Sequence, residues 1–178
     1  MNSSLIIRGL KLSLMVSALG FAQGRAEISP PMQASLENQV GAVVTNLLDA
    51  WHRADARAIS EQYEPDGDFV SPLGDHAVGR RAIEAFYQGA FESGYAQSDA
   101  TATVLHVRDV SREYAIIDGS WMILPTNASK IAQSESGLFV AMLHQHNGRW
   151  WIVALREQTS AQMMREMSPR DEPERCRP

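Results

Sequence analysis

Apolar residues recur every three or four positions along the first predicted element, which follows Ser29-Pro30-Pro31. The positions that share this spacing are Leu36, Val40, Val43, Leu47 and Trp51. They lie on one face of a helix, so the segment predicts an amphipathic helix with its apolar side turned inward. Ser is a good N-cap, and Pro suits the first turn of a helix, where its missing N–H would be unpaired anyway.

Two shorter helices are expected before the main run of strands. Asp55 is a good N-cap for a helix that ends near Tyr63, because Pro65 disfavours helical geometry in the residue before it. A third helix is predicted to begin at Gly79 and to reach its C-cap at Gly94. Its apolar residues, at helical spacing, are Ile83, Phe86, Tyr87, Ala90 and Phe91.

Strand patterns occupy the rest of the chain. Between the second and third helices, Asp68–Val70 predicts a short strand, which Ser71-Pro72 ends, and His76–Val78 predicts a return strand. From Asp99 onward the period changes to two, which predicts long strands at 99–108, 114–124, 136–146 and 149–159. Asn147-Gly148 is a strong hairpin signal. Helices followed by a strand meander indicate an α+β fold with helices on one face of a curved antiparallel sheet.

Composition supports a single globular domain and argues against one class of partner. The chain has 178 residues, 44% hydrophobic and 21% charged, and carries a net charge of −5. Nucleic-acid binding needs a concentrated basic face, so we expect no nucleic-acid partner.

The first 26 residues have the features of a secretory signal peptide. A basic start is followed by the apolar run "LSLMVSALGFA" at 12–22, which is too short to span a bilayer. Cleavage is expected after Ala26, or alternatively after Gly24, and the other interpretations are a membrane anchor or a buried helix. The sequence therefore predicts a protein exported to the periplasm or the medium, with no membrane contact after cleavage.

The domain boundaries follow from the same composition. The folded domain is predicted at 27–162 and a disordered charged tail at 163–178. Cys176, in that tail, is the only cysteine, so no intramolecular disulfide is possible.

Three segments resemble the NTF2-like superfamily, in particular its SnoaL-like and SgcJ/EcaC-type (DUF4440-like) members. They are "AWHRADARAISEQYEPDGDFVSPLG", "GRRAIEAFY", and "AIIDGSWMI" followed by "HNGRWWIVAL". The resemblance covers roughly residues 33–160. It implies a cone in which three N-terminal helices pack on the curved sheet and enclose a conical pocket. The same fold hosts enzymes, binding modules and assembly domains.

The resemblance extends to ketosteroid isomerase as a distant relative, but the residues of this chain do not support that enzyme's mechanism. Its general base corresponds to Ser71 here, and its two oxyanion donors correspond to Leu47 and to a position near Met142. None of these side chains can take those roles unaided. Tyr87 does match a tyrosine that supports the oxyanion network in that family.

The resemblance also implies which strand residues face the pocket. On the strand at 114–124, Ile116, Asp118, Ser120 and Met122 are expected to face inward. Ile117, Trp121 and Ile123 are then expected on an outer face that forms a homodimer. On the next strand, Met142 and His144 are expected inward. For the last strand two alternatives remain: either Trp151, Val153, Leu155 and Glu157 line the cavity, or Arg156 does.

Asp118 and His144 are the candidate acid–base residues. Asp118 lies in the nearly apolar "YAIIDGSWMI", where a carboxylate needs a partner or a raised pKa. His144, on the neighbouring strand, is the expected partner, and the alternative is a purely structural Asp118. The other residues predicted to line the pocket are Trp51, Tyr63, Ser71, Tyr87, Ser120, Met122, Met142 and Glu157.

No metal or cofactor is predicted. His144 and His146 share one strand face, but the sequence indicates no third ligand. Phosphate-loop, dinucleotide and nucleophile-elbow motifs are missing from the sequence. Two functions remain open. In the first, the protein is expected to bind a small, mostly apolar molecule in the conical pocket, with an isomerase-, cyclase- or dehydratase-like reaction as its activity. In the second, it is a non-catalytic dimeric binding or assembly domain.

Overall fold

The computed structural model of the protein describes residues 30–159, and side chains from Leu36 onward. The predicted signal peptide at 1–26 and the predicted tail at 163–178, with Cys176, lie outside these residues. Within 30–159, no helix combines the length and apolar character needed to cross a bilayer.

The helices α1 and α2 follow their sequence signals. Helix α1 spans Pro30–His52, and its predicted stripe faces the protein interior, with Val40 and Val43 buried. Helix α2 spans Ala56–Ser60, and the Asp55 carboxylate accepts a hydrogen bond from the Ala58 N–H at 2.9 Å. The predicted N-cap is therefore confirmed.

Strand β1 begins earlier than predicted. It spans Tyr63–Val70 rather than starting at Asp68, because Tyr63 pairs with Ile152 ahead of an irregular stretch. The turn after it leads into β2, His76–Val78, as expected.

The third helix ends in a wider turn than predicted. Helix α3 spans Arg80–Ala90 and continues as a π-helical turn, Phe91–Tyr95. Gly94 lies in this turn at φ 132°, and a Cβ on it would approach the Lys130 Cβ to 2.9 Å. Gly94 therefore ends the helix as predicted, but through a π turn.

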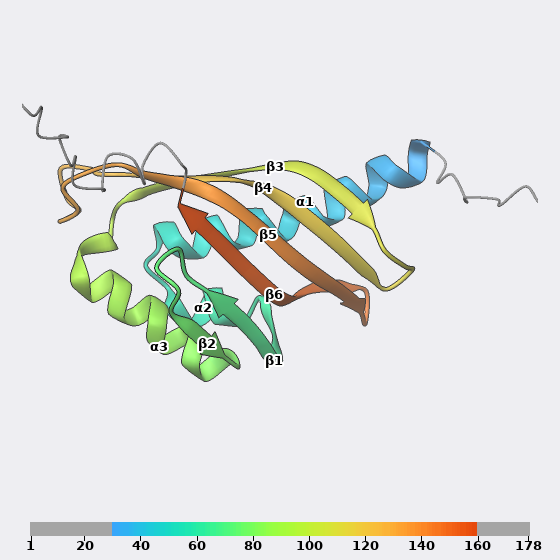
Figure 1. Cartoon of the computed structure of the whole chain (residues 1–178), viewed down its shortest axis with the longest axis horizontal. Coiled ribbons are helices and arrows are strands. Elements are labelled where there is room, and N and C mark those ends of the chain that lie inside the picture. The colour runs from blue at the N-terminus through green and yellow to red at the C-terminus, as the bar shows by residue number, and fades with distance from the viewer. Residues whose placement is uncertain (1–29, 160–178) are drawn as a thin grey trace, which may run out of the picture.

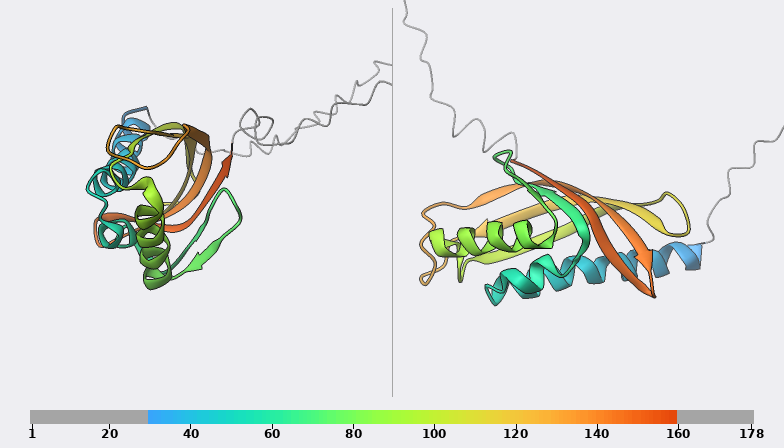
Figure 2. Two further views of the ribbon diagram at one scale, coloured as in Figure 1. Left: turned by 90° about the vertical axis from the view of Figure 1, so that its left-hand side faces the viewer. Right: turned by 90° about the horizontal axis from the view of Figure 1, so that it is seen from below.

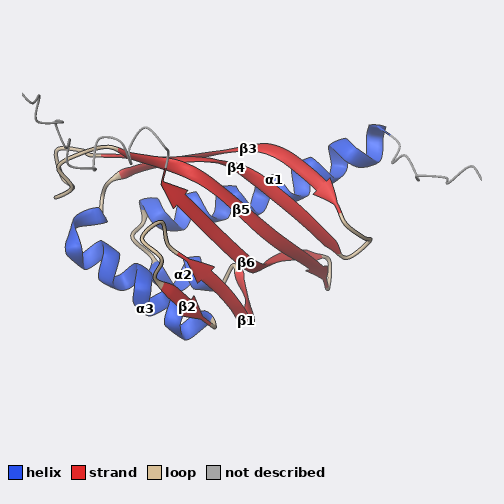
Figure 3. Ribbon diagram, in the orientation of Figure 1, coloured by secondary structure: helices blue, strands red, loops and turns tan. Residues whose placement is uncertain are grey.

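Four long strands complete the sheet: β3 (Asp99–Asp109), β4 (Tyr114–Leu124), β5 (Glu135–His146) and β6 (Arg149–Thr159). Asn147 and Gly148 join β5 to β6 with φ of 52° and 74°, as the predicted hairpin turn requires. The strand order is β2-β1-β6-β5-β4-β3 (Figure 3).

The sheet is mixed and not wholly antiparallel, which corrects one part of the prediction. Strand β1 pairs with β6 in parallel, whereas every other neighbouring pair is antiparallel. A parallel pair needs a crossover connection. The long path through α3 and the meander supplies it.

The helices cover one face of the curved sheet and leave the other face open. Helix α1 runs along the sheet, while α2 and α3 lie beside β1 and β2 (Figures 1 and 2). We call the helix-covered side the concave face and the opposite side the convex face. The core lies between the helices and the concave face, and its largest fully buried side chains include Ile59, Tyr63, Phe69, Ile83, Ile117, Leu143 and Ile152.

Candidate functional site

The strands present the opposite set of residues to the concave face from the one predicted. On β4 the buried positions are Ala115, Ile117 and Gly119, and on β5 they are Gly137, Phe139, Ala141 and Leu143. Asp118, Ser120, Met142 and His144 therefore lie on the convex face. Strand alternation separates two sets of residues but does not say which set is buried. Burial of the apolar set avoids the cost of burying the Asp118 charge.

The predicted pair of Asp118 and His144 does not form. Asp118 bonds His106 Nδ1 at 2.6 Å, and these two side chains are 43% and 77% exposed. In the β4–β5 ladder His144 lies opposite Tyr114, whereas Asp118 lies opposite Val140. The acid–base hypothesis for this pair was therefore wrong.

A bulge decides which residues of β6 face inward. Met142 pairs with Ala154 and Leu143 pairs with Ile152, so Val153 is an extra residue without an opposite partner. As a result, Trp150 and Ile152 are buried before the bulge, and Leu155 and Glu157 line the cavity after it. Neither predicted alternative is fully right, because each assumed unbroken alternation. Trp151, Val153 and Arg156 do not line the cavity.

A cavity of about 930 Å³ lies between the helices and the concave face. Its wall is mainly apolar and aromatic, including Val44, Leu47, Phe69, Phe86, Trp121, Phe139 and Leu155. Of the residues predicted to line it, Trp51, Ser71, Tyr87, Met122 and Glu157 do so, although Met122 is 43% exposed.

The remaining predicted pocket residues lie elsewhere. Tyr63 is fully buried in the core and does not line the cavity. Ser120 and Met142 belong to the convex set and do not line it either. Two further lining residues, Tyr95 and Glu135, were not predicted. Tyr95 lies in the π-helical turn after α3 and Glu135 begins β5, and no local pattern in the sequence brings these two positions together.

Several polar groups of the cavity are already held by neighbours. The Ser71 hydroxyl donates to Asp75 Oδ2 at 2.9 Å and accepts from the Asp75 N–H at 3.0 Å, so it stabilises the turn. Trp51 Nε1 donates to Ser98 Oγ at 3.1 Å. The Tyr95 hydroxyl donates to Glu135 Oε1 at 2.6 Å, and burial together with this bond raises the pKa of Tyr95 to about 12. These groups shape the wall of the cavity.

Glu157 differs from them because its carboxyl group has no hydrogen-bond partner within residues 30–159. Burial in the apolar cavity raises the pKa of Glu157 to about 7. Such a carboxyl group exists in both protonation states near neutral pH. A partnerless ionisable group in a cavity is a candidate acid or base.

Two tyrosines, Tyr63 and Tyr87, lie near enough to Glu157 to interact with its charge. Burial raises the pKa of Tyr87, and the nearby Tyr63 and Glu157 charges raise it further. Burial also raises the pKa of Tyr63, with the charge of Glu157 as the next cause. Both phenols therefore stay protonated at neutral pH. Tyr87 lines the cavity, and its hydroxyl lies beside that of Tyr63, with which it interacts.

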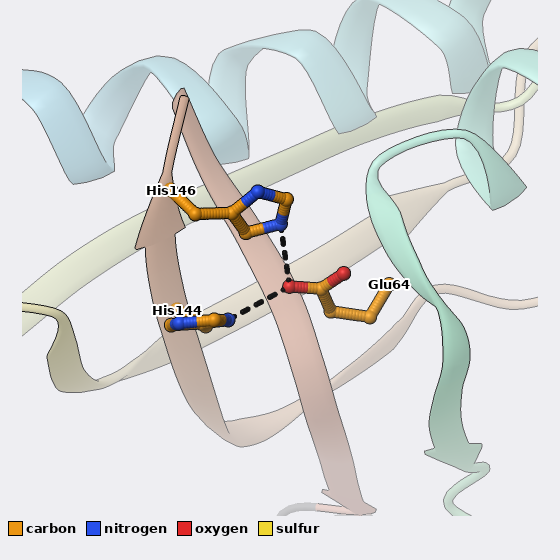
Figure 4. A group of neighbouring side chains, drawn as sticks. All are labelled: Glu64, His144 and His146. Carbon is orange, nitrogen blue, oxygen red and sulfur yellow. Dashed lines mark hydrogen bonds and ion pairs between the residues drawn. The ribbon is translucent and has the colours of Figure 1, made fainter. Parts of the chain in front are cut away.

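The convex side carries two further polar clusters. Arg156 donates to both carboxylate oxygens of Asp68, at 3.1 and 2.6 Å, and His76 Nε2 lies 2.8 Å from Asp68 Oδ2. Burial alone would raise the pKa of Asp68, but these hydrogen bonds lower it below its ordinary value. In the second cluster His144 and His146 both bond Glu64 (Figure 4). The expectation that the histidine pair has no third partner was therefore wrong.

The cone of helices on a curved sheet, with a cavity inside it, defines an NTF2-like fold. A family model described as "SnoaL-like domain" matches residues 44–153. The chain belongs to this SnoaL-like family. The narrower SgcJ/EcaC-type assignment stays a prediction.

Solved structures with the same fold share little sequence with the chain. A cystatin-like domain of unknown function from Nostoc punctiforme has a TM-score of 0.63 and 21% identity, covering 78% of this chain and 83% of its own. A ketosteroid isomerase-like protein from Erwinia carotovora atroseptica has a TM-score of 0.60 and 20% identity, and the match covers 74% of this chain and 96% of that protein. A candidate scytalone dehydratase from Novosphingobium aromaticivorans has a TM-score of 0.63 and 11% identity, and the match covers 74% of this chain and 89% of that protein. A search of curated proteins found no match.

Proposed function

We propose that the protein binds a small, mostly apolar molecule in the concave cavity and transfers a proton on it through Glu157. The observation that carries the proposal is the position of the Glu157 carboxyl group, which lies partly buried in the apolar cavity wall without a hydrogen-bond partner within residues 30–159, so that its pKa is raised to about 7. Proton transfer is most efficient when the pKa of the acid or base lies near the working pH.

The chemistry follows from the groups beside Glu157. Its carboxylate takes a proton from a carbon next to a carbonyl group, and the negative charge moves to the carbonyl oxygen. The Tyr87 hydroxyl turns from Tyr63 to donate a hydrogen bond to that oxygen and stabilises it. Return of the proton from Glu157 to another carbon completes an isomerisation, whereas its transfer to a neighbouring hydroxyl group, which then leaves as water, completes a dehydration.

The cavity limits the class of molecule. About 930 Å³ is near the upper end for a small-molecule site, so a molecule of several fused rings fits. Trp51, Phe69 and Phe86 offer aromatic surfaces to such rings. Similar structures carry the names ketosteroid isomerase-like protein and candidate scytalone dehydratase, which belong to the same two reaction classes. The Ser71 position still argues against the ketosteroid isomerase mechanism itself.

Hydrogen–deuterium exchange on a bound ketone tests the proposal. Cyclic ketones and aromatic polyketide-like compounds are first screened by thermal shift and by fluorescence of Trp51 and Trp121. A hit is then incubated with the protein in D₂O, and uptake of deuterium next to its carbonyl group is followed by NMR. We expect Glu157→Gln to bind the compound but to lose the exchange by at least about 100-fold.

The control for this experiment is Asp118→Asn, which removes a carboxylate from the convex face. Exchange that survives unchanged in Glu157→Gln would contradict the assignment of Glu157. Tight binding with no exchange in the unmodified protein would favour the alternative, a non-catalytic binding domain.

A homodimer through the convex face is the second part of the proposal. Leu138, Val140 and Met142 are 53%, 45% and 37% exposed on β5, which makes an apolar stripe on an open sheet. This stripe replaces the interface predicted from Ile117, Trp121 and Ile123, since all three line the concave cavity. A second copy of the chain, with the same stripe, is a self-complementary occupant.

Export is the third part, and the sequence at 1–26 supports it. Mass spectrometry of the protein recovered from the periplasm or the medium is the test. A mature chain beginning at Glu27 or Arg25 is expected. A chain that keeps the first 26 residues and stays in the cytoplasm would contradict the proposal.

A further inference from the structure

Two histidine rings on the convex side share one carboxylate oxygen. His144 Nδ1 and His146 Nε2 each lie 2.9 Å from Glu64 Oε1. Figure 4 shows both rings pointing at the carboxylate, with Glu64 reaching from β1 to the end of β5. One ligand atom from each of the three residues lies within 4.8 Å of the others.

These three atoms suit a divalent transition-metal ion. Imidazole nitrogen and carboxylate oxygen are common ligands of Zn²⁺, with bonds of about 2.0–2.2 Å. Two neighbouring ligands at that bond length are separated by about 2.8–3.1 Å in octahedral geometry and by about 3.3–3.6 Å in tetrahedral geometry. The two N···O separations of 2.9 Å match the octahedral spacing and need to widen by about 0.4–0.7 Å for the tetrahedral one. All three ligand atoms lie within 4.8 Å of one another, so rotations of these side chains bring them to one ion.

The rings are already held in place by their neighbours. His144 stacks on Tyr114 at 4.4 Å between ring centroids with an 8° interplanar angle, and His146 stacks on Trp151 at 5.5 Å with 15°. Arg149 in turn lies 4.0 Å over the Trp151 ring. Fixed ligands lose less freedom when an ion binds, which favours binding.

Asn147 contacts the outer ring nitrogen of His146. Its side-chain amide contacts His146 Nδ1 at 3.2 Å, the ring nitrogen that does not face Glu64. Metal-bound histidines usually donate this second N–H to an oxygen. Rotation of the Asn147 side-chain amide by half a turn would place its oxygen, in place of its nitrogen, beside His146 Nδ1.

Burial distinguishes this cluster from an ordinary surface pair. The Glu64 side chain is only 14% exposed, while His144 and His146 are 25% and 37% exposed. The carboxylate is thus mostly withdrawn from water, yet an ion can reach the rings. His106 and Asp118 make a comparable short contact, but only one ring faces that carboxylate and both side chains are more exposed.

We propose that Glu64, His144 and His146 form a binding site for a divalent first-row metal ion of the Zn²⁺ class. Three protein ligands leave at least one coordination position for water. Because Glu64 belongs to β1 and the histidines to β5, the bound ion joins two strands that are separated by β6. The ion therefore stabilises this end of the sheet, apart from any chemistry in the concave cavity.

Titration of the full mature chain with Zn²⁺ after removal of metals by a chelator is the test. Calorimetry should give one site per chain, and the melting temperature should rise by about 5–10 °C at a hundredfold excess over Kd. Co²⁺ in place of Zn²⁺ should give visible absorption bands that report its coordination. Glu64→Gln, His144→Gln and His146→Gln should each weaken binding by at least roughly 10- to 100-fold, the loss seen when only a hydrogen-bond partner of a metal ligand is removed.

His106→Gln is the matched control, because it removes a histidine bonded to a carboxylate outside the cluster, and it should leave binding unchanged. Should Glu64→Gln fail to fold, the more exposed His146→Gln carries the test. Failure of the unmodified chain to bind Zn²⁺ with a stoichiometry of one overturns the proposal. Binding that none of the three substitutions weakens also overturns it, because the ion is then held elsewhere.

Discussion

Carboxylates on the two faces of the sheet differ in whether a histidine or arginine side chain contacts them. On the convex face, Glu64, Asp68 and Asp118 each contact at least one histidine or arginine. On the concave face, Glu157 has no such partner, and burial raises its pKa to about 7. Hydrogen bonds from Arg156 and His76 lower the pKa of Asp68, whereas burial without a partner raises that of Glu157 and lets it exchange a proton near neutral pH.

The largest expected effect tests which side of β4 is packed. A methyl group on Gly119 would collide with the Thr103 carbonyl oxygen and lie 2.7 Å from the Phe139 ring. Gly119→Ala should therefore lower the free energy of unfolding by about 3 kcal/mol or more, or prevent folding. Ser120→Ala, one residue along on the convex face, is the control and should stay within about 0.5 kcal/mol. Urea unfolding measures both, and equal losses would contradict the assignment of the faces.

The next effect tests the isolation of Glu157 through the pH dependence of stability. The folded-state pKa of about 7 exceeds the ordinary value of 4.5, so the folded protein holds the proton more tightly than the unfolded chain. Stability therefore falls as the pH rises from about 4.5 through about 7. Glu157→Gln removes this loss, so the variant should match the unmodified protein near pH 4 and exceed it by up to about 3 kcal/mol at pH 8.

Urea unfolding across pH 4–8 gives this profile for both proteins. Glu113→Gln, which removes an exposed carboxylate, is the matched control for the loss of one negative charge. A difference between Glu157→Gln and the unmodified protein that is the same at every pH would show that Glu157 is not isolated from charge partners.

A smaller effect tests the apolar stripe of the convex face. Val140→Glu places a charge in the middle of the proposed dimer contact, so dissociation should become at least about tenfold easier, or about 1.4 kcal/mol. Analytical ultracentrifugation at micromolar concentration measures the change. Val110→Glu, at a 51% exposed position outside the stripe, is the control. A monomer in the unmodified protein would refute the dimer.

The smallest effect concerns Asp118. Its contact with His106 joins two exposed side chains, and such pairs contribute little. Asp118→Asn should change the free energy of unfolding by no more than about 0.5 kcal/mol and leave deuterium exchange in the cavity intact. A loss above about 1 kcal/mol in urea unfolding would mean that the convex face depends on this pair.

The elements and the fold were predictable because their signals are local. Helical spacing predicted α1, the Asp55 cap predicted α2, and Asn147-Gly148 predicted the last hairpin. The family resemblance added the cone and its cavity, and the family match supports that assignment.

The site was less predictable because it depends on relations between distant residues. Period two groups Ile117 with Gly119 and Asp118 with Ser120, but it assigns neither group to the core. The contact between Glu64 and His144 spans 80 residues, so no spacing in the sequence indicates it. Glu157 was predicted to line the cavity, yet its isolation depends on every group around it.

The bulge at Val153 decides which charged residue of β6 enters the cavity. With unbroken alternation from Ile152, Arg156 would enter the cavity and Glu157 would turn to the convex face. One residue taken out of the ladder thus places Glu157 in the cavity, where Glu135 and Asp75 also lie, while Arg156 binds Asp68 outside. A relative that accommodates its extra residue at another point of this strand would keep the same fold but present a cation to its ligand. In this chain the position of a single bulge therefore decides whether β6 supplies a carboxyl group or a guanidinium group to the cavity.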